Sequence, residues 1–350
     1  MGAIDIGVLG ATGMVGQQFL RLLDDHPLFR PAWLAASERS EGKSYRDATT
    51  WRLGGSVPSA AAGATLEACT PGRGPQLVFS ALDAQAAIDI EPAFAAAGHI
   101  VVSNARSFRM LDDVPLLIPE INPEHLALID VQRRERGWRG AIVTNPNCST
   151  VVLAMALAPL RQFGLRTVLT TTLQAVSGAG YPGVPSYDIV GNVIPGIGGE
   201  EEKIESEPNK ILGELRGDRV ALHPAVVSAH TTRVPVIDGH TLTISVSLEQ
   251  TPDIEAVAGA LESWRGRPQE LRLPSAPPAP IEVERDGFRP QPRLDVMRGG
   301  GMAITVGRIR RCPVLGVKLV AMGHNTIRGA AGAAILNAEL MHADGWLEID

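Results

Sequence analysis

Short apolar runs alternate with helix-spaced apolar patterns along the first 148 residues. Residues 4–9 form an apolar run that meets a glycine-rich turn, which is typical of a buried parallel strand. Apolar positions then recur at helical spacing through Val15, Phe19 and Leu23. The same alternation predicts further strands at 31–37, 77–82 and 99–104 and a helix at 84–97. Strands that alternate with helices predict an α/β unit whose parallel sheet is covered on both faces.

The pattern changes after residue 148. Elements of both kinds are predicted there: helices at 149–163, 200–215, 253–265 and 324–343, and strands at 166–178, 226–236, 240–249, 300–311 and 315–323. Residues 178–199 are expected to form a Gly/Pro-rich loop, and 274–292 an extended, irregular connection. We therefore predict two domains. Residues 1–148, together with a C-terminal helix at 325–350, form the first, and residues 149–324 form a second, α+β domain.

The first strand-to-helix turn carries glycines at spacing G-x-x-G-x-x-G. Such a turn brings the backbone close to a pyrophosphate, whose charge then lies against free N–H groups at the helix N-terminus. A glycine-rich turn without a ligand is the alternative. The candidate cofactor residues here are Gly10, Thr12, Gly13, Met14, Val15 and Gly16. A turn of this kind in an α/β unit predicts a Rossmann-type domain.

The end of the second strand bears on the choice of dinucleotide. An NAD site would place an acidic residue there to accept from the ribose 2′-OH. Ser37, Arg39 and Ser40 instead offer hydroxyls and a cation, with Lys43 nearby, and this set suits a 2′-phosphate. Glu38 weakens the argument, and a merely solvated turn is the alternative. NADP is therefore predicted as the cofactor.

Composition and charge further limit the classes of protein to which the chain can belong. The net charge of −6 argues against nucleic acid or an anionic membrane surface as the main partner, and no apolar run reaches the ~20 residues of a membrane helix. The N-terminus does not read as a signal peptide, so a cytoplasmic location is expected. Three cysteines are too few and too dispersed for a disulfide framework or a Cys-rich metal site, and no metal is predicted.

Cys148 is the candidate nucleophile. It follows a probable strand and begins a helix, where the dipole and free N–H groups are expected to lower its pKa. Those N–H groups, with the Asn147 side chain, are candidates to hydrogen-bond an oxyanion. A small buried thiol is the structural alternative, which applies to Cys69 and Cys312. Of the eight histidines, His240 opens a strand after a turn and is the candidate acid/base.

Eight segments in order carry a family resemblance: GATGMVGQQFLRLL, ASERSEGK, SNARSFRM, PNCST, QAVSGAG, EEEKIESEPNKILG, RVPVIDGHT and HNTIRGAAGAA. Together they resemble aspartate-semialdehyde dehydrogenases, particularly the archaeal and fungal branch, over residues 4–340. The resemblance implies NADPH-dependent reduction of β-aspartyl phosphate through a cysteine thioester in the biosynthesis of lysine, threonine and methionine. It also implies a homodimer or homotetramer, with residues 1–148 and the C-terminal helix as the NADP-binding domain and residues 149–324 as the catalytic and oligomerisation domain.

The resemblance also implies individual roles. Cys148 becomes the nucleophile, His240 the acid/base and Gln174 a group that positions the thioester. Contacts to the substrate carboxylate, ammonium and phosphate are implied for Arg233, Glu200, Lys203 and Arg109. Further cofactor contacts are implied at Ser80, Ser177, Gly178, Asn325 and Thr326. Glu201 and Glu202 compete with Glu200 for its role, and Arg106 shares or replaces that of Arg109.

Three other activities compete with this interpretation. Malonyl-CoA or succinyl-CoA reductases would share the cysteine, the histidine and the NADP site but need no ammonium acceptor. N-acetyl-glutamyl-phosphate reductase uses similar chemistry, but its motifs fit less well. A non-catalytic dinucleotide sensor would tolerate loss of Cys148 or His240, and both are present.

Overall fold

The N-terminal half folds around a parallel sheet of six strands. In the computed structural model, which describes residues 2–347, the strand order is β3-β2-β1-β4-β5-β6 and every pairing is parallel. The strands are β1 (Ile4–Leu9), β2 (Phe29–Ala36), β3 (Leu66–Ala68), β4 (Leu77–Ser80), β5 (Ile100–Ser103) and β6 (Ala141–Thr144). The predicted Rossmann-type parallel sheet is confirmed.

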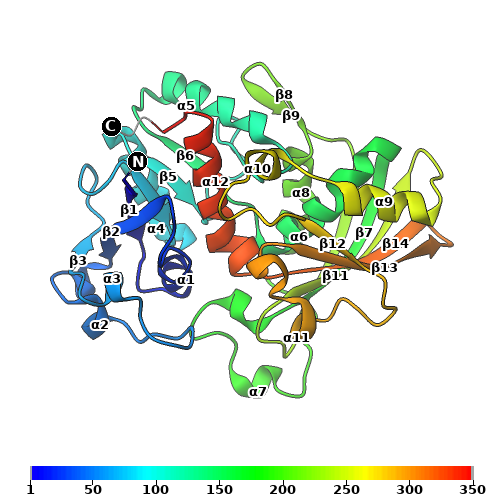
Figure 1. Ribbon diagram of the computed structural model, residues 1–350, viewed down its shortest axis with the longest axis horizontal. Helices are drawn as coiled ribbons and strands as arrows, with labels where there is room; N and C mark the ends of the chain where they lie inside the picture. Colours follow the sequence, from blue (N-terminus) through cyan, green and yellow to red (C-terminus); the bar gives the residue numbers. More distant parts are fainter. Residues whose placement is uncertain (1, 348–350) are drawn as a thin grey trace.

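Helices cover both faces of this sheet because its strands are apolar on both sides. The helices of this half are α1 (Met14–Leu22), α2 (Tyr45–Ala48), α3 (Ser59–Ala62), α4 (Ala84–Ala97) and α5 (Leu128–Arg136). Side chains of α1 and α5 share one core with the C-terminal helix α12 (Gly332–Ala343), and α4 packs on the opposite face. Figure 1 shows α12 between the two halves of the molecule. The last three residues of the predicted helix 325–350 lie outside the described residues.

The second half contains a mixed six-stranded sheet of order β10-β7-β11-β14-β13-β12. Its strands are β7 (Leu165–Gln174), β10 (Val226–Arg233), β11 (His240–Leu248), β12 (Ile281–Glu284), β13 (Ile304–Cys312) and β14 (Gly316–Gly323). A separate hairpin pairs β8 (Glu214–Arg216) with β9 (Arg219–Ala221). The predicted α+β character of this half is confirmed, and the boundary at residue 148 stays a prediction.

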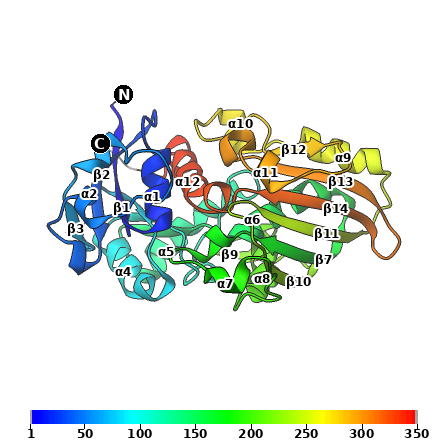
Figure 2. The same ribbon diagram turned by 90° about the horizontal axis from the view of Figure 1, so that it is seen from below.

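One face of this second sheet is covered by helices and the other is open (Figure 2). The helices of this half are α6 (Cys148–Leu157), α7 (Ser186–Ile189), α8 (Glu201–Ile211), α9 (Ile254–Ser263), α10 (Arg267–Leu271) and α11 (Pro292–Asp295). Residues of α6, α8 and α9 join the inward side chains of the strands in one core. On the open face, Leu169, Leu173 and Val226 are exposed.

Several predicted elements differ in detail. The helix predicted at 200–215 ends at Ile211, and its last residues belong to the strand β8. The helix predicted at 149–163 is α-helical only to Leu157 and continues as a 3-10 helix, and the loop predicted at 178–199 contains α7. The strand predicted at 166–178 ends at Gln174, because the chain turns there into a 3-10 turn at Val176–Ala179. The connection predicted as irregular at 274–292 contains β12, which pairs in parallel with β13, a long-range contact that local pattern cannot reveal. The last helix begins with a π-helical turn at Ile327–Ala331.

Candidate active site

The glycine turn after β1 has the geometry that the sequence predicts. Gly10 has φ 73°, in the left-handed region that favours glycine. A Cβ on Gly16 would lie 2.3 Å from the Gly10 carbonyl oxygen, so the turn and α1 approach too closely for a side chain. Gly13 caps α1 without any side-chain cap hydrogen bond, which leaves N–H donors of the first turn for a ligand. Thr12, Met14 and Val15 are partly exposed around it.

The turn after β2 lies at the same sheet edge, because β1 and β2 pair in parallel. Ser37 and Arg39 are exposed and Ser40 is half-buried, within a turn that includes a short 3-10 helix at Glu38–Ser40. Their hydroxyls and guanidinium border the same end of the sheet as the glycine turn. These residues fit a dinucleotide that carries a 2′-phosphate.

The residues predicted to contact the nicotinamide side of the cofactor differ in how accessible they are. Ser80 is fully buried and lies beside the Glu91 carboxyl, so its side chain is not accessible to a bound cofactor. Asn325 uses both ends of its amide: Oδ1 accepts from the Gly239 N–H at 2.9 Å, and Nδ2 donates to Ser177 Oγ at 2.7 Å. Asn325 therefore holds the segment before His240. Thr326 and Gly178 are more accessible.

Cys148 is the first residue of α6 and contacts His240. Its Sγ lies 3.2 Å from His240 Nε2, and β11 begins at that histidine. Asn147 caps the helix: its Oδ1 accepts from the N–H groups of Ser149 and Thr150, while its Nδ2 donates to Glu200 Oε2 at 2.8 Å. The N–H of Cys148 itself therefore remains as the candidate oxyanion donor of this turn.

The expectation of a lowered thiol pKa is wrong. Burial, with a smaller contribution from the Glu200 carboxylate, raises the pKa of Cys148 to about 12, against the opposing effect of Arg109 and Arg233. These lowering contributions do not offset the loss of solvation. Cys148 is thus a neutral thiol at pH 7 in these surroundings.

His240 is held in one tautomer. Its Nδ1 accepts from the Ala175 N–H at 3.1 Å, so in the neutral ring the proton is on Nε2, which faces the thiol. Burial, then the charges of Arg233 and His324, lower the pKa of His240 to about 3. The ring is therefore neutral at pH 7, and Nε2 is a donor toward Sγ.

Charged groups surround this pair. Lys203 Nζ donates to Glu200 Oε1 at 2.5 Å, and Gln174 Nε2 lies 3.5 Å from Glu200 Oε2. Arg233 donates from Nη1 to the Ala175 carbonyl at 2.8 Å, which leaves most of its donors free. Glu201 accepts instead from the Thr231 N–H at 2.9 Å, and Glu202 is exposed. Of the three glutamates, Glu200 faces the nucleophile.

The two candidate arginines have different surroundings. Arg109 is buried, with Nη1 donating to Glu207 at 2.9 Å and Nη2 to the Asn104 carbonyl at 2.8 Å. Three of its five N–H donors remain. Arg106 is exposed, and its guanidinium lies beside Gly199 just before α8. The structure thus keeps both arginines as candidates.

Sequence reasoning missed Glu207, Lys210 and Gly329. Glu207 and Lys210 are buried on α8 around Arg109, and their spacing from Glu200 and Lys203 was the available indication. Gly329 lies so close to the nucleophile that a Cβ there would be 2.6 Å from Cys148 Cβ. No local pattern reveals that approach.

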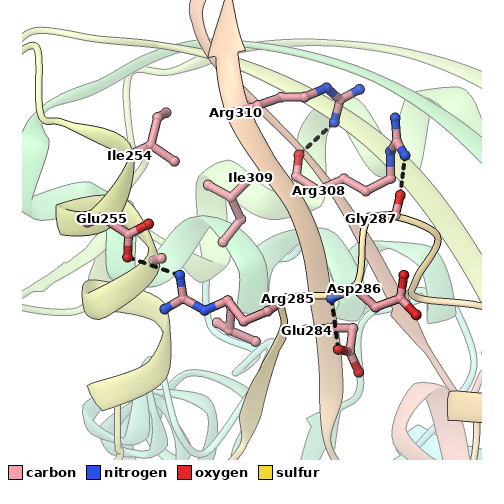
Figure 3. Close-up of a pocket in the computed structure, with 11 residues that line it drawn as sticks. Ile254, Glu255, Glu284, Arg285, Asp286, Gly287, Arg308, Ile309 and Arg310 are labelled. Atoms are coloured by element: carbon pink, nitrogen blue, oxygen red, sulfur yellow. Dashed lines mark hydrogen bonds and ion pairs between the residues drawn. The ribbon is translucent and has the colours of Figure 1, made fainter.

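A surface pocket of about 380 Å³ elsewhere contains none of these residues (Figure 3). Its arginines are engaged within the pocket: Arg285 pairs with Glu255, Arg308 donates to the Gly287 carbonyl, and Arg310 donates to the Arg308 carbonyl. Among residues 2–347, no cluster of three His, Cys, Asp or Glu side chains could hold a metal ion. Within the same range, no helix is long and apolar enough to cross a membrane.

The fold and the site define a class. A dinucleotide domain is joined to a catalytic domain whose cysteine contacts a histidine, as in oxidoreductases that act through a covalent cysteine intermediate. Two family models match, the semialdehyde dehydrogenase NAD-binding domain over residues 5–129 and the semialdehyde dehydrogenase dimerisation domain over residues 157–328.

Similar proteins narrow this class. Aspartate-semialdehyde dehydrogenase of Archaeoglobus fulgidus is 52% identical over 96% of this chain and 97% of its own, and that of Saccharomyces cerevisiae is 44% identical over 96% and 97%. A crystal structure of aspartate semialdehyde dehydrogenase with NADP from Candida albicans has TM-score 0.91 at 41% identity, over 99% of this chain and 100% of its own. The chain belongs to the aspartate-semialdehyde dehydrogenase family, and the predicted membership is confirmed.

Proposed function

We propose that the protein catalyses NADPH-dependent reductive dephosphorylation of L-aspartyl 4-phosphate to L-aspartate 4-semialdehyde. The observation that carries this proposal is the 3.2 Å contact between Cys148 Sγ and His240 Nε2, surrounded by Arg233, Glu200 and Lys203. The substrate carries a carboxylate, an ammonium and an acyl phosphate. Family membership supports the same reaction, which supplies a step in lysine, threonine and methionine biosynthesis.

The first half-reaction is an acyl transfer. Cys148 Sγ attacks the acyl carbon while the thiol proton passes to a phosphate oxygen of the substrate, the C–O bond to phosphate breaks, and the proton leaves with the phosphate. The Cys148 N–H hydrogen-bonds the oxyanion, and Gln174 and Asn147 hold Glu200 beside the acyl group.

The second half-reaction releases the aldehyde. NADPH, when bound, supplies the hydride that reduces the thioester. The resulting oxyanion collapses and the C–S bond breaks, returning the electron pair to Cys148. His240 Nε2–H is placed to hydrogen-bond that thiolate as it forms, because Nδ1 is engaged by Ala175, and a proton taken up from water then restores the neutral thiol.

Substrate recognition follows from the charges. Arg233 retains enough donors to bind the α-carboxylate as a fork, and Glu200 accepts from the ammonium, exchanging part of its bond to Lys203. Lys203 and Arg109 bind the phosphate, with exposed Arg106 as an additional cation. The three sites match three groups of one amino-acid acyl phosphate.

NADP fits the open N-terminus of α1 and the Ser37, Arg39 and Ser40 turn, as argued above. The similar Candida albicans enzyme was crystallised with NADP, which supports the same cofactor.

We further propose a homodimer or homotetramer formed through the open face of the second sheet. The match to a dimerisation domain supports association, and the exposed Leu169, Leu173 and Val226 supply an apolar surface there. Light scattering on Leu169→Lys against the wild type tests this assignment. A cytoplasmic location and small-molecule partners, without nucleic acid or membrane, complete the proposal.

The competing substrate is malonyl-CoA or succinyl-CoA. Those thioesters have no ammonium, so Glu200 would have no partner on the substrate, and this favours the amino-acid acyl phosphate. The test compares phosphate-dependent NADP reduction with aspartate semialdehyde against NADPH oxidation with each CoA thioester. Activity only with a CoA thioester would contradict the substrate assignment, and inactivity in all assays would favour a dinucleotide sensor.

A further inference from the structure

Four charged residues lie at spacing i, i+3, i+7 and i+10 along one face of α8 and its N-cap: Glu200, Lys203, Glu207 and Lys210. Such spacing keeps side chains on one face of a helix. A charged face usually points to solvent, but here Glu207 is 2% and Lys210 3% exposed. Burying a carboxylate and an ammonium is unfavourable unless each is fully paired. The partners of these two groups therefore show what the arrangement achieves.

The Glu207 carboxylate joins two parts of the active site. Its Oε1 accepts from Arg109 Nη1 at 2.9 Å, and its Oε2 accepts from the Asn147 N–H at 2.7 Å. Arg109 is the proposed phosphate cation, and Asn147 directly precedes the nucleophile Cys148. A single carboxylate thus links the phosphate cation to the peptide that holds the thiol.

The Lys210 ammonium fixes the loop that carries Arg109. Its Nζ donates to the carbonyl oxygens of Arg109, Leu111 and Val114 at 2.8, 2.6 and 2.8 Å. All three donors of the ammonium are thereby used. Burial lowers the pKa of Lys210 to about 8, against the opposing charges of Asp112 and Asp113. Because Lys210 binds the Arg109 backbone and Glu207 its guanidinium, both ends of that arginine are held from α8.

We infer that Glu207 and Lys210 are positioning residues of the phosphate subsite. Glu207 sets the orientation of the Arg109 guanidinium, so that the remaining N–H donors of Nη1 and Nη2 are presented to phosphate. Lys210 fixes the position of the Arg109 backbone relative to α8 through its hydrogen bond to the Arg109 carbonyl oxygen. This inference rests on the proposed function, since it assigns phosphate to Arg109. A cluster that only joined the two domains would affect stability alone, whereas this one is expected to affect the use of phosphate.

The test is Glu207→Gln, assayed in the direction that consumes aspartate semialdehyde, NADP and phosphate. Glutamine keeps the shape, but its amide can accept with only one of its two terminal atoms. We expect the KM for phosphate to rise about tenfold or more, because Arg109 loses a charged partner, while the NADP Kd changes by less than about twofold. Lys210→Met is expected to change the phosphate KM in the same direction, and Glu207→Gln suffices where that variant does not fold.

Glu205→Gln is the matched control. Glu205 lies on the same helix, and its Oε1 likewise accepts a backbone N–H, that of Ala229 at 3.0 Å, but it does not contact Arg109 or Asn147. Its phosphate KM should equal that of the wild type even if its melting temperature falls. An unchanged phosphate KM in Glu207→Gln, or the same rise in Glu205→Gln, would overturn the inference. If the wild-type enzyme shows no phosphate-dependent NADP reduction, the proposed function is wrong, and the phosphate subsite that depends on it is wrong as well.

Discussion

Gly329 lies against the nucleophile, and replacing it with alanine isolates that contact. A Cβ at residue 329 would lie 2.6 Å from Cys148 Cβ and 3.0 Å from Cys148 Cα. Attractive carbon–carbon contacts lie at about 3.5–4.0 Å, so the new methyl is about 1 Å too close to an atom fixed on the backbone. The π-helical turn or the start of α6 must therefore move.

The expected magnitude follows from that overlap. Overpacking of a core costs about 1–3 kcal/mol, which exceeds the roughly 1 kcal/mol that alanine gains over glycine as a helix former. A displacement of about 1 Å at the reacting group lowers the rate about 100-fold. We therefore expect Gly329→Ala to lose about 100-fold in kcat with a modest loss of stability, measured by NADPH production and by urea unfolding.

Gly259→Ala is the matched control for this change. Gly259 lies within α9, and a Cβ there has no atom within 4 Å. It should gain about 0.4–1 kcal/mol in stability and keep wild-type kcat. Wild-type kcat in Gly329→Ala would refute the argument that the C-terminal segment presses on the nucleophile.

Three further predictions concern charge and proton binding. Arg233→Lys, which cannot make a planar fork, should raise the KM for aspartate semialdehyde by about tenfold or more and leave the NADP Kd unchanged, as steady-state kinetics and titration would show. Arg39→Ala should weaken NADP binding by about tenfold while NAD binding is unaffected, and equal losses for both would refute a 2′-phosphate contact. The pKa of His240, about 3 when folded, lies below its unfolded value of about 6.5, so the unfolded chain binds the extra proton between these values. The neutral, buried His240 therefore contributes to the free energy of unfolding above pH ~6.5, and this contribution is lost as the pH falls toward 3. Urea unfolding at pH 7 and pH 5 should show that the free energy of unfolding falls less in His240→Asn than in the wild type.

The parts of the fold that were predictable are those that follow from the local spacing of apolar residues. The apolar run at β1, the glycine turn and the helical spacing through Phe19 specify one strand–turn–helix unit without reference to distant residues. The strand β12 was not predictable, because it exists only through its pairing with β13. The local pattern of apolar residues thus predicts individual helices and strands. Whether a segment joins a sheet as an edge strand depends on a partner that is distant in the sequence.

The site divides in the same way. Cys148 and His240 belong to sequence motifs, and the structure brings them within 3.2 Å. The raised pKa of Cys148 was not predictable, because it depends on how many atoms from distant segments exclude water from the thiol. Glu207 was missed for a related reason: a glutamate in a helix rich in charges is typical of a solvated face, and only its tertiary partners show that it is buried.

In the proposed reaction, Cys148 carries the acyl group as a thioester. The most direct measurement mixes the enzyme with aspartate semialdehyde and NADP without phosphate, follows NADPH on the millisecond scale, and then maps the acylated peptide by mass spectrometry. We predict a burst of one NADPH per active site, an aspartyl adduct on the peptide that contains Cys148, and turnover once phosphate is added. Cys148→Ala should bind NADP and show neither burst nor adduct. A burst without an adduct at Cys148, or full turnover in Cys148→Ala, would contradict a thioester at Cys148.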